Sequence, residues 1–357
     1  MKFGIFYEHQ LPRPWADGDE HRLLKDALDQ VELADRLGYD YVWEVEHHFL
    51  EEYSHSSAPE VFLAAASQRT QRIRLGHGIT LLPSAYNHTA RVVERINTLD
   101  LLSDGRVDFG SGESSSNAEL EGFGIDRSTK REQWLDHIEA ATRMMVEEPF
   151  AGWDGPWLQM PPRNVVPKPY QRPHPPLWVA CSQPDSFRAA GEMGLGVLCF
   201  NLAGYGQMKE RVDMYREGLK HANPVGQFVN DQVAALCLVH CGEDDEEARV
   251  VAAPEGLWFV NKAEELYRPW QGRDVPDSYR FSVNAVQQER VDKTAQDHLE
   301  SGAFAMGNPD TVTKVLRKYQ EAGVDQVLCF MQMGNLEHYR IMESIKLFGR
   351  QVIPFFQ

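Results

Sequence analysis

Short apolar runs alternate with amphipathic stretches along most of the chain. The apolar runs occupy residues 3–7, 41–45, 73–82, 106–110, 177–181, 197–200, 233–239 and 327–330. Continuous apolar runs of this length are typical of strands in a parallel sheet that is buried on both faces. Eight strand–helix units favour a closed (β/α)8 TIM barrel, an α/β fold, and the alternative is an open doubly wound sheet.

The stretches between the runs have helical periodicity. Apolar residues recur at helical spacing from Leu24 to Ala34, and Gly38 ends that helix. Further helices are predicted at about 60–68, 89–102 and 130–146. The last crossover helix has Asn308 as its N-cap, Pro309 at its first position and Gly323 at its end.

Two segments interrupt this pattern, after the fourth and the seventh strand. Residues 149–176 are rich in proline and are expected to be extended on the surface. Residues 245–305 make an unusually long connection, which suggests a cover over the barrel mouth, an interface or a peripheral helical decoration. Its aromatic residues are Trp258, Phe259, Tyr267, Trp270, Tyr279 and Phe281. We therefore expect one barrel domain over residues 1–357 with these two insertions.

Bulk composition excludes several classes of protein. The formal charge of −17 argues against nucleic-acid binding, which needs clustered lysine and arginine. No apolar run is long enough to span a membrane, and no signal segment is recognisable. The five scattered cysteines form neither a CxxC pair nor a zinc motif, so a cytoplasmic location is expected.

The second predicted strand ends in an acid and two histidines. Barrel enzymes carry their chemistry at strand C-termini, which makes Glu46 and His47 candidate catalytic residues. Neighbouring side chains on an extended strand point in opposite directions, so at most one of His47 and His48 is expected to enter the site. The surrounding His and Glu residues lack metal-ligand spacing, and no metal is expected.

Three other predicted strand ends carry small or polar residues. The third ends in Gly-His-Gly-Ile-Thr at 76–80, where glycine lets a ligand ring approach the backbone. The fourth ends in a hydroxyl-rich loop at 110–117. The fifth leads through Cys181 and Ser182 into a helix start at Pro184, a potential anion site. Nucleotide, nicotinamide, zinc-protease and hydrolase motifs are absent from the sequence.

The order of these pieces resembles the bacterial luciferase-like family of flavin-dependent oxidoreductases over essentially the whole chain. The matching residues are 1–4 (Met-Lys-Phe-Gly), 42–43 (Val-Trp), 46–49 (Glu-His-His-Phe), 81–83 (Leu-Leu-Pro), 101–106 (Leu-Leu-Ser-Asp-Gly-Arg), 109–110 (Phe-Gly), 123–124 (Phe-Gly), 175–180 (Pro-Pro-Leu-Trp-Val-Ala) and 322–325 (Ala-Gly-Val-Asp).

The resemblance implies FMN bound at the C-terminal mouth of the barrel. Reduced FMN would come from a separate flavin reductase, and O2 would add to it as a flavin 4a-hydroperoxide that oxygenates a small-molecule substrate. His47 matches the histidine assigned to proton transfer in the family. Gly78 and Ile79 match a frequent non-proline cis peptide beneath the flavin. The implied cofactor contacts are Gly78, Ile79, Ser111, Glu113, Ala180, Cys181, Ser182, Asp185 and Ser186, with Ser182 and either Asp185 or Ser186 at the phosphate. The family also implies a homodimer that pairs through the first helices.

One position departs from the family pattern. Luciferases carry a phosphate-binding arginine where this chain has Glu113. A carboxylate there would repel a phosphate, so either the loop turns Glu113 away, or Arg131, Arg163 or Lys168 supplies the charge, or FMN binds weakly. We expect a substitute cation.

The leading functional hypothesis is a two-component monooxygenase that uses reduced FMN and O2. The alternatives are a deazaflavin-dependent hydride-transfer enzyme of the same fold and, because of Glu113, a flavin-binding protein without catalysis. Aromatic side chains, namely Tyr7, Phe200 and Trp258, are expected to line an apolar substrate site. The sequence leaves open the identity of the substrate and whether light is emitted.

Overall fold

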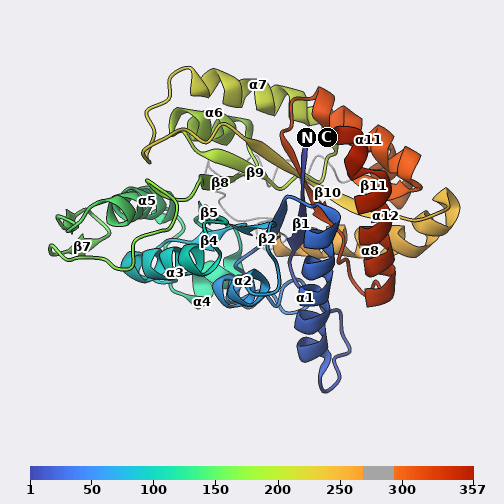
Figure 1. Cartoon of the computed structure of the whole chain (residues 1–357), viewed down its shortest axis with the longest axis horizontal. Helices are drawn as coiled ribbons and strands as arrows, with labels where there is room; N and C mark the ends of the chain where they lie inside the picture. The colour runs from blue at the N-terminus through green and yellow to red at the C-terminus, as the bar shows by residue number, and fades with distance from the viewer. Residues whose placement is uncertain (268–292) are drawn as a thin grey trace.

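The computed structural model describes residues 1–267 and 293–357, and its centre is a closed barrel of eight parallel strands (Figure 1). In order around the barrel the strands are β1 (Lys2–Tyr7), β2 (Tyr41–Glu44), β3 (Arg74–His77), β5 (Val107–Gly112), β8 (Leu177–Cys181), β9 (Gly196–Cys199), β10 (Val233–Cys241) and β12 (Gln326–Phe330). The pairing of β12 with β1 closes the ring. All eight predicted strands are present, and the predicted (β/α)8 fold is confirmed.

Helices surround this barrel (Figure 1). They are α1 (Asp19–Leu37), α2 (Pro59–Ser67), α3 (Thr89–Leu102), α5 (Lys130–Val146), α6 (Pro184–Glu192), α7 (Met208–Leu219), α11 (Pro309–Glu321) and α12 (His338–Gln351). Gly38 caps α1 with φ 88°, a left-handed conformation that favours glycine. Asn308 caps α11, and its side chain accepts a hydrogen bond from the Thr311 N–H, as the sequence predicts.

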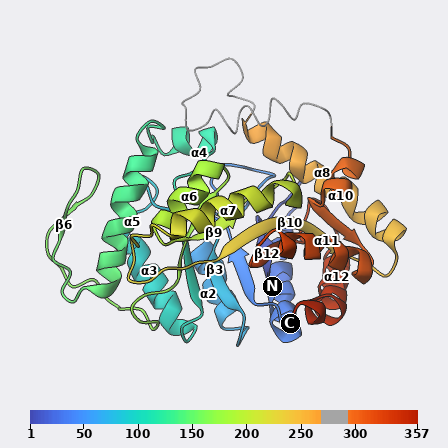
Figure 2. The same cartoon turned by 90° about the horizontal axis from the view of Figure 1, so that it is seen from above.

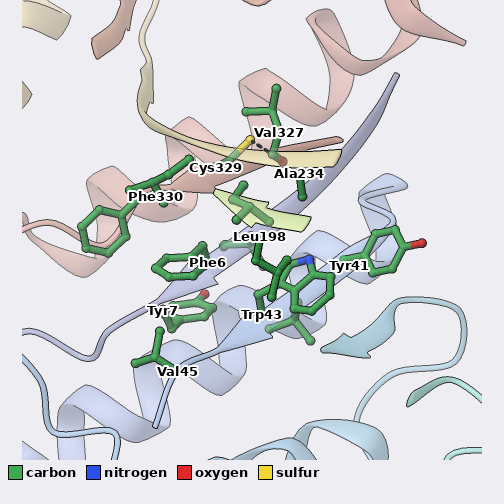
Figure 3. Close-up of a cluster of buried hydrophobic side chains, with 14 of the residues drawn as sticks. Phe6, Tyr7, Tyr41, Trp43, Val45, Leu198, Ala234, Val327, Cys329 and Phe330 are labelled. Carbon is green, nitrogen blue, oxygen red and sulfur yellow. Dashed lines mark hydrogen bonds between the residues drawn. The ribbon is translucent and has the colours of Figure 1, made fainter. Parts of the chain in front are cut away.

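The barrel interior is filled by large side chains (Figure 3). The Trp43 indole lies 5.2 Å from the Trp178 ring, and the Phe6 ring lies 5.9 Å from that of Phe330. Gly76 makes this packing possible, because a Cβ there would lie 2.2 Å from the Trp43 ring. The glycine at 76 thus serves packing of the barrel and not a ligand.

Additional elements lie between the barrel strands. The first insertion contains a two-stranded antiparallel hairpin of β6 (Trp153–Asp154) and β7 (Gln159–Met160), which lies at the periphery beside α5 (Figures 1 and 2). The short elements β4 (Thr80–Leu81) and α4 (Asn117–Gly122) follow β3 and β5. The described residues also contain two 3-10 helices. The first, η1 (Tyr205–Gln207), lies between β9 and α7, and η3 (Ile353–Phe356) follows α12.

The second insertion contains α8 (Asp245–Tyr267), α10 (Ala295–Ser301) and β11 (Phe304–Gly307). Within the described residues, strand β11 pairs with the end of β10 alone, outside the barrel, and it is an element that the sequence pattern did not predict. Trp270, Tyr279 and Phe281 lie outside the described residues. Over residues 1–267 and 293–357, no helix has the length and apolarity that a membrane span requires.

Candidate active site

The C-terminal ends of the barrel strands form the candidate site. Helices α4 and α8 lie along one edge of the molecule, opposite the edge that carries the two chain termini (Figure 2). Because β1 starts near the N-terminus, the α4–α8 edge is the mouth of the barrel. Ala180 is exposed although it lies within β8 and its neighbours in that strand are buried. The barrel therefore opens to solvent beside the end of β8.

His47 lies at this mouth between two carboxylates. Its Nδ1 donates to Glu119 Oε1 at 2.9 Å, and its Nε2 lies 3.5 Å from Glu8 Oε2. Both carboxylates are almost fully buried, whereas 24% of the His47 side chain is exposed. The imidazole is thus held from two sides and still reaches solvent.

His48 and Glu46 form a separate, structural pair. His48 Nε2 donates to Glu46 Oε1 at 3.1 Å, and the His48 ring packs edge-on against Phe123. The Leu81 N–H donates to Glu46 Oε2 at 2.8 Å, and the Asn87 side chain donates to Oε1 at 2.9 Å. Of the two histidines, His47 contacts Glu8 and Glu119, whereas His48 contacts Glu46. The structure does not support a catalytic assignment for Glu46, because its oxygens anchor the segment after β3.

The carboxylates control the charge of His47. Burial of the ring acts to lower the pKa of His47. The negative charges of Glu119 and Glu8 outweigh this effect and raise the pKa of His47 to about 9. Burial, opposed by the His47 charge, raises the pKa of Glu8 to about 7. Burial also acts on Glu119, but the His47 charge and three hydrogen-bond donors leave the pKa of that carboxyl below its usual value. At neutral pH His47 is therefore an imidazolium, suited to donate a proton.

Glu8 and Glu119 are two residues around His47 that sequence reasoning missed. Gly4 and Phe6 both face the barrel interior, so strand alternation could have placed Glu8 there as well. Ser116 caps α4, and its side chain accepts from the Glu119 N–H. The Ser-x-x-Glu spacing is the signature of a helix start, which could have located Glu119 on the first turn after the fourth strand.

The segment after β3 presents a small surface to the mouth. Gly78 and Ile79 are both partly exposed, and a Cβ at Gly78 would meet no atom closer than 3.5 Å. Unlike Gly76, Gly78 leaves open space. In the described part of the chain, cis peptide bonds precede only prolines, so the Gly78–Ile79 bond is trans, contrary to the expectation from the family resemblance.

Glu113 is neutralised by two cations from the start of α5. Lys130 Nζ lies 3.6 Å and Arg131 Nη1 lies 3.9 Å from Glu113 Oε1. Burial, only partly offset by the charge of Glu113, lowers the pKa of Lys130 to about 8. Arg131 also packs over the Trp134 ring at 4.4 Å. One carboxylate with two cations leaves a net positive charge at this strand end.

The other two proposed cations are elsewhere. Arg163 is exposed and donates to the Pro162 carbonyl beside the β6–β7 hairpin. Lys168 Nζ donates to the carbonyls of Met144 and Glu147, at the C-terminal end of α5. Both cations are remote from Glu113, whose partners Lys130 and Arg131 lie at the start of α5. Of the three predicted cations only Arg131 is near Glu113, and Lys130 was missed.

Of the predicted cofactor contacts at the ends of β5 and β8, some have side chains that are buried and hydrogen-bonded within the protein, and others are exposed. The Ser111 hydroxyl is buried and accepts from Trp134 Nε1 at 3.0 Å, so the structure does not support its side chain as a cofactor ligand. The Cys181 thiol is buried and donates to the Ser186 carbonyl at 3.5 Å, so this side chain does not face the mouth either. By contrast, Ser182 and Asp185 are exposed beside the first turn of α6.

Ser186 is engaged within α6. Its hydroxyl donates to the Gln183 carbonyl at 2.6 Å and accepts from the Gln183 N–H at 3.3 Å, as part of a capping box. Asp185 and Ser186 are the two alternatives for the second phosphate contact. Asp185 has no hydroxyl group, and the hydroxyl of Ser186 already donates to Gln183. Among the described residues at this helix start, Ser182 is exposed and its hydroxyl is not part of the capping box.

Aromatic side chains on α8 and the strand ends cover the mouth. The Phe259 ring lies 4.6 Å from Phe330 at the end of β12 and 5.6 Å from Tyr53. Phe200, after β9, lies 6.0 Å from Phe259 and is partly exposed, as is Trp258. An ion pair of 2.8 Å between Lys262 and Glu52 fastens α8 to the loop after β2. The described part of the second insertion thus covers the mouth.

Tyr7 does not belong to this aromatic cover. Its side chain is fully buried, its hydroxyl donates to Gln30 of α1 at 3.0 Å, and its ring stacks on His9. The structure therefore does not support Tyr7 as a substrate contact. Its neighbour Phe6 has the inward-facing position in β1.

The model of a known family, described as luciferase-like monooxygenase, matches residues 1–326. The chain belongs to this family. Limonene 1,2-monooxygenase of Rhodococcus erythropolis is 26% identical over 100% of this chain and 87% of its own. The alkanal monooxygenase alpha chain of the Kryptophanaron alfredi symbiont is 28% identical over 99% and 98%. The oxygenase component of flavin-dependent trigonelline monooxygenase from Acinetobacter baylyi is 23% identical over 100% and 96%.

Solved structures show the same luciferase-like fold. The monooxygenase RslO1 of Streptomyces bottropensis superposes with a TM-score of 0.82, at 25% identity and full coverage of both chains. The oxygenating constituent of 3,6-diketocamphane monooxygenase from Pseudomonas putida, in complex with FMN, gives 0.79 at 21% identity, over 99% and 98%. The F420-dependent tetrahydromethanopterin reductase of Methanopyrus kandleri gives 0.73 at 21%, over 100% and 99%. This luciferase-like protein is thus an oxidoreductase of the monooxygenase type.

The mouth of this luciferase-like monooxygenase fits a flavin phosphate. Ala180 and Ser182 are exposed at the end of β8, and a Cβ at Gly78 would meet no atom closer than 3.5 Å. The charge at Glu113 does not oppose an anion, because Lys130 and Arg131 neutralise it.

Proposed function

We propose that this protein is the oxygenase component of a two-component monooxygenase that takes reduced FMN from a separate reductase. The observation that carries the proposal is the His47 imidazolium, held by Glu119 and Glu8 at the open end of the barrel. Reduced flavin, when bound, supplies the electrons that activate O2. Because the sequence has no nicotinamide-binding motif, we expect FMN to be reduced on another protein.

The residues of this chain would bind the cofactor and hold one proton. Arg131 and Lys130 would attract the phosphate, and Ser182 would donate a hydrogen bond to it. Nδ1 of His47 is committed to Glu119, so the proton that can be transferred is the one on Nε2. The aromatic cover of Phe200, Trp258 and Phe259 would exclude bulk water from the site.

The same cover suggests the substrate class. Its members come from the end of β9 and from α8, and those that are partly exposed offer an apolar wall. A small, predominantly apolar organic molecule is the substrate that such a wall fits.

A deazaflavin-dependent hydride-transfer enzyme is the second candidate. F420-dependent enzymes share the fold, as the reductase of Methanopyrus kandleri shows with its TM-score of 0.73. The monooxygenase relatives, which match along the whole chain, favour the oxygenase.

Anaerobic titration distinguishes the two candidates. Purified protein is titrated with reduced FMN, reduced riboflavin and reduced F420 under anaerobic conditions, and binding is followed by fluorescence. We expect reduced FMN to bind at least tenfold more tightly than reduced riboflavin, because only FMN carries the phosphate. Tight binding of reduced F420 without binding of reduced FMN would contradict the proposal and favour the hydride-transfer enzyme.

A further inference from the structure

Glu8 is a buried carboxylate that neither the family resemblance nor the sequence motifs assign. It follows β1, is 1% exposed, and belongs to the inward-facing set of that strand with Gly4 and Phe6. The Tyr53 hydroxyl donates to Glu8 Oε1 at 3.3 Å, and the Ser54 hydroxyl donates to the Glu8 carbonyl at 2.7 Å. These contacts fix the side chain and the backbone of Glu8 in one place.

The other oxygen of Glu8 is the unusual one. Oε2 is buried and accepts no hydrogen bond from any described residue, and 3.5 Å separates it from His47 Nε2. A buried carboxylate oxygen without a donor is costly unless a positive charge is near. The imidazolium of His47 supplies that charge.

The contact with Glu119 determines what His47 presents to Glu8. Nδ1 donates to Glu119 at 2.9 Å, so Nδ1 carries a hydrogen. When Glu8 is ionised, a neutral ring would turn the lone pair of Nε2 toward its carboxylate, which is repulsive. An N–H at Nε2 is attracted instead, and the ring is then an imidazolium.

Other charged groups around His47 are paired elsewhere. Glu44 lies 2.8 Å from His9 and Glu46 lies 3.1 Å from His48, so each of these carboxylates has its own histidine. Tyr53 faces both residues, through its ring to His47 and through its hydroxyl to Glu8. Glu8 and Glu119 are the two carboxylates that contact the His47 ring.

We propose that Glu8 is a positioning residue that holds the His47 imidazolium against Glu119 and keeps its Nε2 protonated at the barrel mouth. The looser contact, at 3.5 Å, leaves the Nε2 proton transferable, whereas the firm contact at Nδ1 fixes the ring. The use of this proton in turnover rests on the proposed function, but the charge and orientation of His47 do not.

Histidine NMR of the protein without flavin tests this inference directly. Uniformly 13C/15N-labelled histidine is introduced, and the His47 signal is assigned by its absence in His47→Gln. In the wild type we expect a His47 pKa of about 9. Glu8→Gln keeps the shape and an acceptor for Tyr53 but removes the charge, so the pKa of His47 should fall by about one unit or more.

Two variants serve as controls. Glu8→Asp retains the charge and should restore most of the His47 pKa. Glu44→Gln removes another buried carboxylate, at the end of β2, that contacts His9 and not His47, and it should leave the His47 pKa unchanged. If Glu8 had only a structural role, Glu8→Gln would lower the melting temperature without changing the His47 pKa.

A reciprocal measurement covers the case in which Glu8→Gln does not fold. The 13C-carboxyl titration of Glu8 should give a pKa of about 7 in the wild type and a higher value in His47→Gln, because the cation that opposes the effect of burial is lost. A His47 pKa that is the same in wild type and Glu8→Gln, or a Glu8 pKa that ignores His47→Gln, would overturn the inference. Failure of reduced FMN to bind would instead contradict only the proposed function.

Discussion

Glu46, His47 and His48 are consecutive residues, yet their contacts at the barrel mouth differ. Glu46 and His48 bond to each other and to the segments around them, and His47 instead meets Glu8 and Glu119. The alternation of side chains along an extended backbone separates the two sets. A histidine and a carboxylate therefore form a structural contact on one side of this segment, and a histidine with two carboxylates forms the candidate site on the other.

The first prediction concerns this pair of histidines. His47→Ala should keep the fold and the affinity for reduced FMN but lower coupled product formation by tenfold or more, within the ~10²–10⁴ range of general acid–base catalysis. His48→Ala should mainly lower the melting temperature, because it loses the bond to Glu46 and the packing on Phe123. Product yield per reduced FMN consumed is the measurement, and unchanged coupling in His47→Ala would refute the assignment.

The second prediction concerns the cation that replaces the family arginine. Arg131→Ala should weaken FMN binding at least tenfold, about 1.4 kcal/mol, and spare riboflavin. The matched control is Arg163→Ala, whose side chain lies at the hairpin and should have no effect. Glu113→Arg should not tighten FMN, because it would add a third cation beside Lys130 and Arg131. Tighter FMN binding in Glu113→Arg, with no loss in Arg131→Ala, would show that Glu113 itself faces the phosphate.

Elements differ in how well the sequence predicts them. Helices α3 and α5 have the predicted ends, since periodicity and flanking signals agree there. Strand β11 and helix α4 escaped prediction, because four or six residues carry too little periodicity. The strand ends located His47 and Ser182, and strand alternation could have located Glu8, but Lys130 is brought to the site by tertiary packing and not by a local motif. The sequence alone therefore predicts the barrel better than the contacts at its mouth.

The third prediction belongs to helix α8 as the cover of the mouth. Phe259 is fully buried between Phe330 and Tyr53, so Phe259→Ala should destabilise the protein by about 3–5 kcal/mol. Phe355→Ala removes an equally large but exposed ring in η3 and should stay within about 0.5 kcal/mol. Chemical denaturation of both variants is the measurement. Equal, small effects would show that α8 does not pack on the barrel mouth.

At the scale of the whole molecule, buried neutral histidines contribute to the loss of stability in acid. Burial lowers the pKa of His77, beside Thr80, and that of His240, at the end of β10, to about 4 in each case. A lowered folded-state pKa contributes stability that is present above the unfolded pKa of about 6.5 and is lost as the pH falls through 4. The fourth prediction is a falling melting temperature between pH 6.5 and 4.

Two substitutions test whether protonation of His77 causes this slope of melting temperature against pH. His77→Gln should flatten it, since the titrating ring is gone, whereas His221→Gln removes an exposed ring and should leave it unchanged. Thermal melts of the three proteins across this pH range are the measurement. An identical slope in His77→Gln would show that protonation of His77 does not limit acid stability.

The fifth prediction is a homodimer formed through the first helices, as the family resemblance implies. Val61 on α2 is 66% exposed and Leu24 on α1 is 39% exposed, so this face carries accessible apolar groups. Val61→Glu should shift the protein toward monomer in sedimentation velocity at micromolar concentration. Val250→Glu, on α8, changes an equally exposed valine and should not do so. A monomeric wild type would contradict the prediction.

Rapid mixing with oxygen tests the central claim, oxygenation by reduced FMN, most directly. The anaerobic complex of the protein with reduced FMN is mixed with O2 in a stopped-flow spectrometer, and free reduced FMN is the reference. The account predicts a delayed return of oxidised FMN through a spectrally distinct oxygenated flavin, and a faster decay of that species in His47→Ala, which forms less product. Reoxidation at the rate of free FMN, in a protein that binds reduced F420 tightly, would contradict it.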